Sequence, residues 1–271
     1  GEGEEGEGEE GEGEEGEGEG EGEGEGEGEP CPTVLDTDFF VESDDEMATV
    51  AGACGVFGGL FINGRGVTTL APLASLEFVT TSLQIFDTSA TNLGGLELLE
   101  SVGGLALTDN ALLEDVTALS RLTEAGVVNT TGCPLLRSLA GLENVDLEGS
   151  QVLLAGLPAL TDISAIRRPA IANLIVEECD GLTSFAGLGG DTQVTEQLAV
   201  TNNASLRSLD GLEGMRNATR VIVSVNASLD DVSALAGLET TGLLSIDGSP
   251  TLTSLPIFAA LTSTEPTLLV S

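Results

Sequence analysis

The chain lacks several residue types on which enzymes depend. Its 271 residues include no His, no Lys, no Trp and no Tyr, and eight basic residues stand against 46 acidic ones. Without His, the Ser-His-Asp and Cys-His nucleophile systems and the usual zinc ligand sets are excluded. Without Lys, Schiff-base chemistry and the phosphate-binding P-loop are excluded as well. The composition therefore predicts a protein that is not an enzyme and carries no cofactor.

Charge of one sign dominates the sequence, with a formal net charge of -38 at pH 7. Such a surface repels nucleic acids and anionic lipid headgroups at long range, so neither is expected as a partner. Solubility is the simplest interpretation of the excess; a cationic ligand and adaptation to salty surroundings are the alternatives. No run of eighteen apolar residues occurs, so no transmembrane span is predicted.

Residues 1–30 alternate Gly and Glu and end at Pro30. Sixteen of the 46 acidic residues lie in this tract, which has no basic or large apolar residue. Since Gly maximises backbone freedom and like charges repel, the tract is predicted to be a disordered, extended spacer. A diffuse cation-binding tail is the alternative, which is disfavoured because carboxylates without fixed geometry hold metals poorly. The sequence begins without Met and shows no signal peptide, which we interpret as processing or truncation.

The rest of the chain repeats. An apolar residue recurs every 22 to 24 residues and opens a phrase in which apolar residues alternate, as in a short strand with one buried face. Further aliphatic residues follow 8, 11 and 14 positions after most starts. Recurrence at a fixed interval indicates one supersecondary unit stacked on copies of itself. The ten starts are Leu60, Leu83, Leu105, Val128, Val152, Leu174, Leu198, Val221, Leu244 and Leu268.

Each unit has room for one short strand and a looping path, because nothing between the strands has the pattern of a helix of three turns. One unit cannot bury its own leucines, whereas units stacked about 4.8 Å apart form a continuous core. We therefore predict an all-β fold, a parallel β-helix-like solenoid of about ten rungs over residues 60–271, preceded by an N-terminal cap at residues 31–59. The pairs Gly58-Gly59 and Gly103-Gly104 are interpreted as corners rather than phosphate cradles.

One slot, five residues after the strand start, carries a small or polar residue in most repeats and Leu157 in one. An inward Asn there can bond the free backbone groups of the turn, and neighbouring rungs repeat the arrangement. Cys is a small, weakly polar substitute at such a buried position. The predicted structural ladder consists of Asn110, Cys133, Cys179, Asn203 and Asn226. Asn203 and Asn226 also open Asn-x-Ser triplets, which we expect to be buried and unmodified.

The phrase Leu-x-Ile-x-x-Asn-x-x-Leu-x-x-Leu-x-x-Leu, with Cys54 just ahead of the strand at Leu60, resembles the receptor L domain family. This family comprises the β-helical ligand-binding domains of the insulin and epidermal growth factor receptors. The resemblance covers about residues 31–271. The chain is also similar to bacterial surface lipoproteins in which a Gly/acidic spacer separates a lipidated Cys from an L-domain-like solenoid. The resemblance implies an extracellular or cell-surface location, facing outward from a bacterial envelope, with a lipid anchor upstream of residue 1. No Cys-rich module or kinase follows, so growth-factor signalling is not implied.

Four cysteines allow three pairings. The likeness to L domains implies a bridge between Cys31 and Cys54, which flank a capping segment with a short helix expected over residues 44–53. Cys133 and Cys179 fall in the same ladder slot two rungs apart, about 9.6 Å at the usual strand spacing. Because a disulfide needs Cα atoms within about 7 Å, we predict that these two are reduced and buried.

The outward residue of each strand carries no charge. The functional interpretation is a flat, partly apolar face for a protein or glycan partner. The alternative is that β-branched and aliphatic residues simply suit strands. The candidate binding residues on this face are Phe61, Asn129, Leu153, Ile175 and Ile222.

Carboxylates offer the remaining chemistry. Glu177, Glu178 and Asp180 follow one strand closely, in a pattern compatible with Ca²⁺ binding or with a carbohydrate-cleaving site. A solvated acidic turn is the simpler interpretation, so no metal site is predicted.

The sequence thus favours a non-enzymatic recognition or scaffold domain that binds a protein or glycan through a solenoid face. A carbohydrate-active β-helix enzyme is the alternative. A leucine-rich-repeat protein in the ordinary horseshoe form fits less well, because that motif needs Asn-x-Leu where this chain has Asn203-Ala204-Ser205-Leu206.

Overall fold

A computed structural model describes residues 33–167, 170–262 and 267–270, the last four by their backbone alone. The chain divides into two units, Gly1–Pro30 and Cys31–Ser271. The acidic tract, for which a disordered spacer is predicted, lies outside the described residues. The second unit holds the repeats, and its fold is all-β.

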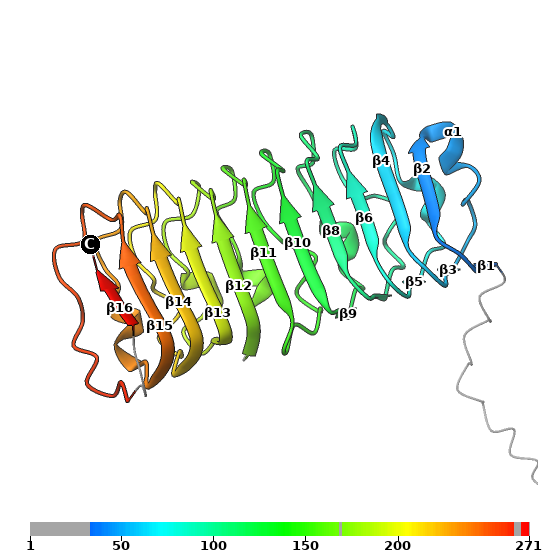
Figure 1. Ribbon diagram of the computed structural model, residues 1–271. Coiled ribbons are helices and arrows are strands. Elements are labelled where there is room, and N and C mark those ends of the chain that lie inside the picture. Colours follow the sequence, from blue (N-terminus) through cyan, green and yellow to red (C-terminus); the bar gives the residue numbers. More distant parts are fainter. Residues whose placement is uncertain (1–32, 168–169, 263–266, 271) are drawn as a thin grey trace, which may run out of the picture. The chain divides into compact units, whose positions relative to one another are not determined.

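The solenoid is built on an eleven-stranded parallel sheet whose neighbouring strands come from successive repeats (Figure 1). All ten predicted starts pair in register, from Leu60 with Leu83 to Leu244 with Leu268. The predicted parallel β-solenoid is therefore confirmed. Its strands are β2 (Phe39–Ser43), β4 (Leu60–Gly66), β6 (Leu83–Phe86), β8 (Leu105–Thr108), β10 (Val127–Thr131), β11 (Gln151–Ala155), β12 (Ala170–Glu177), β13 (Gln193–Thr201), β14 (Asn217–Ser224), β15 (Thr240–Asp247) and β16 (Thr267–Val270).

Strand β2 adds a rung ahead of the first predicted start, since Phe39 pairs with Leu60. It lies within residues 31–59, the segment that the sequence assigns to a cap. Helix α1 (Asp44–Met47) follows directly and is shorter than the helix expected over residues 44–53. The Ser43 hydroxyl accepts a hydrogen bond from the Glu46 N–H at 3.3 Å, which is the usual way to begin a helix.

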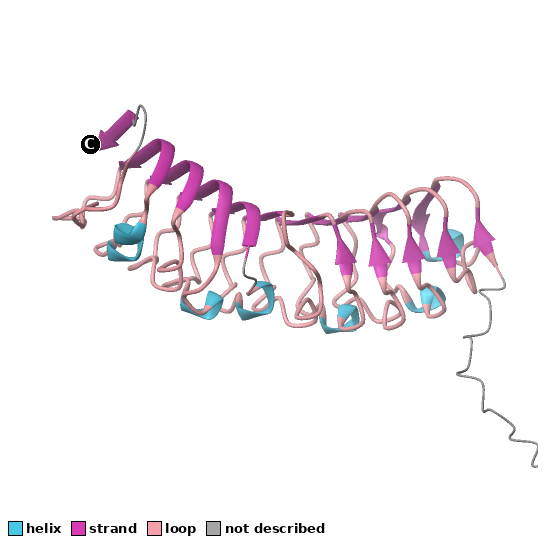
Figure 2. Cartoon of the chain, turned by 90° about the horizontal axis from the view of Figure 1, so that it is seen from below, coloured by secondary structure: helices cyan, strands magenta, loops and turns pink. Residues whose placement is uncertain are grey.

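A second, five-stranded sheet runs along a corner of the first rungs: β1 (Val34–Leu35), β3 (Gly55–Val56), β5 (Phe78–Val79), β7 (Ser101–Val102) and β9 (Glu124–Ala125). Figure 2 shows the main sheet along one side of the solenoid and short helices along the opposite side. These are 3₁₀ helices of three to five residues, too short to be read from periodicity: η1 (Ala71–Leu73), η2 (Thr117–Leu119), η3 (Ser164–Ile166), η4 (Ala186–Leu188) and η5 (Ser233–Gly237).

The core is one continuous column of aliphatic side chains. From β4 to β15 each strand start and the residue two positions later are buried, and the aliphatic residue eight positions after most starts packs against the same core. Leu113, Leu136, Leu160, Leu182, Leu206 and Leu229 are at most 1 % exposed. Leu252, in the last such position, is only partly buried. No helix in the described part of the chain is long and apolar enough to span a membrane.

From β6 to β15 a left-handed residue follows each strand of the main sheet, four positions after the repeat start. The next residue is the ladder slot, which is buried from Thr88 to Asn226. Glycine occupies the left-handed position at Gly132, Gly156 and Gly248, with φ of 61 to 62°. Elsewhere Asp87, Asp109, Glu178, Asn202 and Val225 hold it with φ of 47 to 57°. Asp and Asn tolerate this conformation, whereas a β-branched residue such as Val225 is strained there.

The predicted Asn ladder is confirmed by its hydrogen bonds. The Asn203 side-chain amide donates to the carbonyls of Val176 (3.1 Å) and Thr201 (3.0 Å), and its oxygen accepts the Cys179 N–H at 2.9 Å. Asn226 repeats this one rung further along: it donates to the Val200 carbonyl and accepts the Asn203 N–H, each at 2.9 Å. Because both side chains are fully buried, their triplets are closed to glycosylation, as expected.

Candidate functional site

All five candidate binding residues lie on the outer face of the main sheet and in the same column. In-register pairs place Phe61 beside Gln84, Asn129 beside Leu153, and Leu153 beside Ile175. Since alternate residues of a strand share a face, and their neighbours Leu60 and Ile62 are buried, this column points away from the core. The predicted placement of these residues is therefore correct.

The side chains of this outer column form a long row rather than a single pocket. Seven strand intervals separate Phe61 from Ile222, which corresponds to about 34 Å at 4.8 Å per interval. Asn129, Leu153, Ile175 and Ile222 are each half-buried by their neighbours. The Asn129 Oδ1 atom is buried and has no hydrogen-bond partner. Such a row suits contact with an extended partner, and no single small ligand could touch all of it.

At the N-terminal end of this face two phenylalanine rings are stacked. Phe40 of β2 is paired in register with Phe61 of β4. Their ring centroids are 4.8 Å apart and their planes differ by 12°. This spacing equals the usual distance between neighbouring strands, so the sheet itself sets the stacking. Phe40 remains 68 % exposed, the highest value of any phenylalanine among the described residues.

A hollow of about 210 Å³ lies beside the stacked rings. It is formed by two columns of side chains on three neighbouring strands. The first column holds Phe40, Phe61 and Gln84, and the second, two residues further along each strand, holds Glu42, Asn63 and Phe86. We call these six residues the phenylalanine pocket.

Sequence reasoning missed Phe40 and Phe86. Phe40 lies in the segment assigned to the cap, although a run of aromatic and β-branched residues such as Phe39-Phe40-Val41 is typical of a strand. Phe86 is 41 % exposed and follows the candidate column by two residues, so it shares the outer face of the sheet. Considering every outward position of each strand would have found it.

The acidic candidates do not gather into a site. Glu177 is the last residue of β12 and accepts a hydrogen bond from the Asn202 side chain at 3.3 Å. Glu178 is the left-handed residue of the turn, and Asp180 accepts the Ala204 N–H at 2.7 Å. No group of three His, Cys, Asp or Glu side chains able to hold a metal occurs within the described ranges. Glu177, Glu178 and Asp180 are therefore not brought together as a set of Ca²⁺ ligands in the described structure.

Many other carboxylates stabilise turns. Ten residues after the strand starts, the side chains of Asp115, Asp162 and Asp231 accept the backbone N–H two residues ahead at 2.7 to 2.9 Å. This is the Asx turn, in which a short side chain replaces a backbone acceptor.

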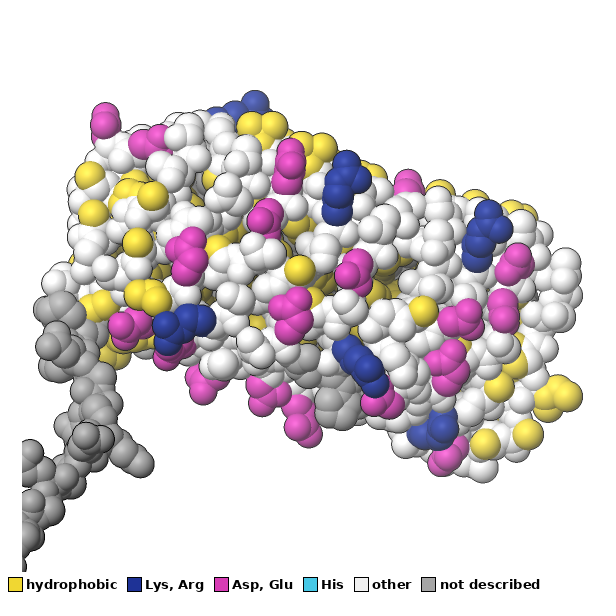
Figure 3. Space-filling view, turned by 180° about the vertical axis from the view of Figure 1, so that it is seen from behind, with side chains coloured by type: hydrophobic (Ala, Val, Ile, Leu, Met, Phe, Trp, Pro, Cys, Tyr) yellow, Lys and Arg dark blue, Asp and Glu magenta, His cyan; other side chains and the backbone are white. Residues whose placement is uncertain are grey.

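The recurring Gly-Leu-Glu triplets form a second motif. Glu97, Glu143 and Glu213 each accept the N–H of the glycine two residues earlier, at 2.7 to 2.9 Å. Figure 3 shows the loop side, where acidic and arginine side chains are interspersed. These acidic side chains thus hold the turns of the loop side.

Cys133 and Cys179 are free and buried, as predicted. Burial raises the pKa of the Cys133 thiol to about 11 and that of Cys179 to about 12. Both thiols are therefore neutral at ordinary pH and unreactive. Cys31 lies outside the described residues, and no pair of cysteines within the described part of the chain is bridged. The Cys31–Cys54 bridge stays a prediction.

No family model matches the chain, and no curated protein matches it. The resemblance to receptor L domains thus stays an inference from the repeat phrase. The outer face of the main sheet therefore provides the observations that bear on function.

Proposed function

We propose that residues 31–271 form a non-enzymatic recognition or scaffold domain that works at the cell surface or outside the cell. The domain binds a protein or glycan partner through the outer face of its main sheet. In this proposal the Gly/Glu tract is a spacer that holds the domain away from its attachment. The likeness of the repeats to receptor L domains supports the same assignment.

One observation carries the proposal: the central outward column, from Phe61 to Ser245, has no charged residue in a chain of net charge -38. A preference for strand-forming residues would explain the aliphatic members of this row but not Asn129, since Asn is depleted in strands. Apolar and amide side chains in a continuous row are instead typical of a surface that is covered by a partner.

The test compares two sets of charge insertions in the full chain. The first set is Leu153→Asp, Ile175→Asp and Ile222→Asp on the outer column. The control set, Leu112→Asp, Leu135→Asp and Ile257→Asp, places the same charges on exposed apolar residues outside the strands. Both triple variants are checked for native circular dichroism before use.

Glycan arrays and arrays of purified extracellular proteins are then screened with all three chains. We expect a saturable partner whose affinity falls at least about tenfold with the sheet variant and less than about twofold with the loop control, because buried interface charge is costly. Equal loss in both sets, or none in either, contradicts the proposal. Turnover of a glycan that disappears in Glu177→Ala/Glu178→Ala/Asp180→Ala would favour the enzyme alternative.

A further inference from the structure

The phenylalanine pocket differs from the rest of the outer face in two ways. Two of its three aromatic rings, Phe40 and Phe86, are more exposed than the half-buried aliphatic residues that continue the column. It also contains a carboxylate, Glu42, which no donor among the described residues bonds. Exposed aromatic faces beside a free carboxylate form a site for an organic cation, because the ring quadrupole and the negative charge both attract it.

The surrounding charges favour the same ligand. Residues 36–46 contain six acidic and no basic residues. Three of these acids are used internally: Asp38 accepts the Gly59 N–H, Asp44 bonds Thr68, and Glu46 accepts the Glu42 N–H at 2.7 Å. The last bond fixes the backbone of Glu42 at the end of β2, while the side chain of Glu42 stays available.

The nearest arginine along the chain does not neutralise Glu42. The Arg65 Nε atom is 2.9 Å from Asp87 Oδ1, so this guanidinium already has a partner. A neutral sugar would gain binding free energy from contact with the rings and with the Asn63 and Gln84 amides, but none from the net charge. A cation gains binding free energy from the rings, the amides and the negative net charge.

We propose that the phenylalanine pocket receives an arginine side chain of a basic protein partner, with its guanidinium between the rings and the Glu42 carboxylate. This inference rests on the proposed function, of which it names one subsite. A hollow of 210 Å³ covers only the head of such a ligand. Because so small a contact binds weakly alone, the rest of the affinity comes from the adjoining column, which is why the ligand is a segment of protein and not a free small cation.

The experiment uses the isotope-labelled full chain and three small probes. Acetyl-arginine methylamide is titrated and followed by backbone amide chemical shifts. Acetyl-citrulline methylamide has nearly the same shape without the charge, and maltotriose represents a neutral sugar. We expect shifts confined to β2, β4 and β6 for the arginine probe, and binding at least about fivefold weaker for citrulline.

Two variants test the pocket, each with a matched control. Phe40→Leu and Glu42→Gln are expected to weaken arginine binding at least about fivefold. Phe57→Leu, which alters another exposed phenylalanine at 55 % exposure, and Glu114→Gln, which removes an exposed acid on a distant rung, are expected to leave it unchanged. Equal weakening by Glu114→Gln would show a general charge effect and overturn the inference. Tighter binding of maltotriose than of arginine, lost in Phe40→Leu, would overturn it in favour of a glycan.

Failure here and failure of the proposed function give different results. If arginine does not bind but the charge insertions at Leu153, Ile175 and Ile222 abolish partner binding, the recognition face stands and the subsite falls. If arginine binds in the pocket while those insertions have no effect, the broader proposal falls and the pocket acts alone.

Discussion

The two halves of the solenoid share a core but turn their corners differently. In the first half the main-sheet strands β6 and β8 have four residues each, and a sharp corner separates them from the short strands of the second sheet. In the second half β12 to β15 have eight or nine residues and run through the same position without a corner, as the long curved ribbons of Figure 2 show.

Glycine shapes one of these corners, the one ahead of β8. Residue type alone does not account for the difference between the halves, because Thr81 precedes β6 by two residues and Gly242 lies at the equivalent position inside the continuous strand β15. Gly103 precedes β8 by two residues, and a Cβ atom there would overlap the carbonyl oxygens of Thr80 and Thr81 on the previous rung. The corner therefore closes only without a side chain, which confirms the interpretation of the Gly103-Gly104 pair. The equivalent residue ahead of Val221 is Thr219, an exposed residue within the continuous strand β14.

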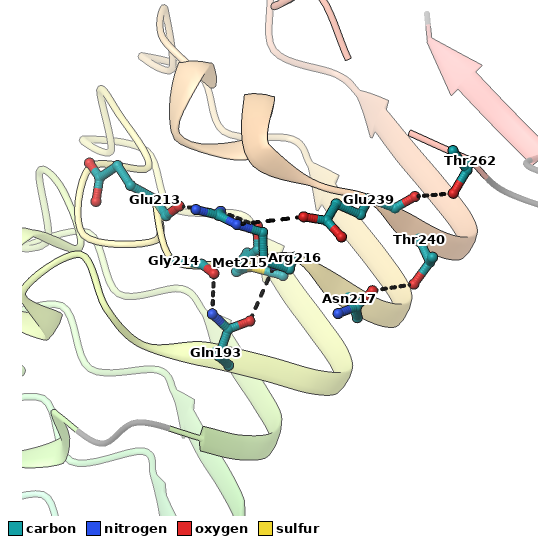
Figure 4. A network of polar contacts seen from close by, with 9 residues as sticks. All are labelled: Gln193, Glu213, Gly214, Met215, Arg216, Asn217, Glu239, Thr240 and Thr262. Atoms are coloured by element: carbon teal, nitrogen blue, oxygen red, sulfur yellow. Dashed lines mark hydrogen bonds and ion pairs between the residues drawn. The ribbon is translucent and has the colours of Figure 1, made fainter. Parts of the chain in front are cut away.

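Side chains add to the backbone pairing in the later rungs, above all between the first residues of β13 and β14, where the paired register begins only at Gln197. The Gln193 amide donates to the Gly214 carbonyl and accepts the Arg216 N–H at 3.2 Å, as a peptide group of a neighbouring strand would (Figure 4). The Arg216 guanidinium donates to the Glu213 carbonyl at 2.7 Å and approaches Glu239 at 3.9 Å. The core ladder thus fixes the position of each rung, while the shape of the corner varies from one half of the solenoid to the other.

Truncation of a core leucine should lower the free energy of unfolding more than any other change, and by a similar amount in both halves of the solenoid. Leu113 and Leu206 lie eight residues after their strand starts, at 1 % and 0 % exposure. We expect each Leu→Ala change to lower the free energy of unfolding by about 2 to 5 kcal/mol, as lost burial plus a cavity. Urea unfolding measures both. A loss below about 0.5 kcal/mol at Leu206 would show that this side chain is outside the core.

Cysteine chemistry should separate the N-terminal end from the ladder. A Cys31–Cys54 bridge would contribute about 3 kcal/mol through loop closure. Because burial raises the pKa of both ladder thiols, we expect no alkylation of the native chain at pH 8.

Counting alkylated thiols by mass spectrometry after denaturation completes that test. Two should react without reductant and all four after reduction. Four reacting thiols without reductant would mean that the bridge is absent, and reaction of Cys133 in the native chain would mean that its slot opens.

Periodic features were predictable because each rung repeats them. The strand starts, the leucine column and the Asn203–Asn226 ladder all follow from spacing alone, since identical slots must stack. Phe40 escaped this reasoning because β2 precedes Leu60 by 21 residues, outside the 22 to 24 of the other repeats. Whether the carboxylates of Glu177 and Asp180 come together depends on the direction of single side chains, which the spacing of residues in the sequence does not determine. The stacked phenylalanines and the Gln193 bridge are likewise contacts between rungs rather than patterns within one.

Exchanging two equivalent residues tests whether the corner at Gly103 requires the absence of a side chain. We expect Gly103→Thr to cost about 1 to 3 kcal/mol, because the side chain must displace the previous rung. The reverse change, Thr219→Gly, should cost no more than about 1 kcal/mol, mainly through backbone entropy in a strand. Thermal and urea unfolding of both variants give the values. Equal costs would mean that steric exclusion at Gly103 is not what makes the corner.

The smallest expected effect tests whether side chains stabilise the later rungs. Arg216→Ala removes the bonds to the Glu213 and Met215 carbonyls and the pairing with Glu239, all partly exposed, so we expect a loss of up to about 1 kcal/mol. Arg65→Ala is the matched change in the first half, where the second sheet already joins the rungs and the side chain is 79 % exposed. Its loss should be close to zero and should vanish in high salt, since only an exposed ion pair is removed. The Arg216 variant should keep most of its loss in salt, because hydrogen bonds to carbonyls remain there. If the two arginines cost the same in high salt, the hydrogen bonds of Arg216 add nothing to the backbone pairing and core packing that hold the later rungs together.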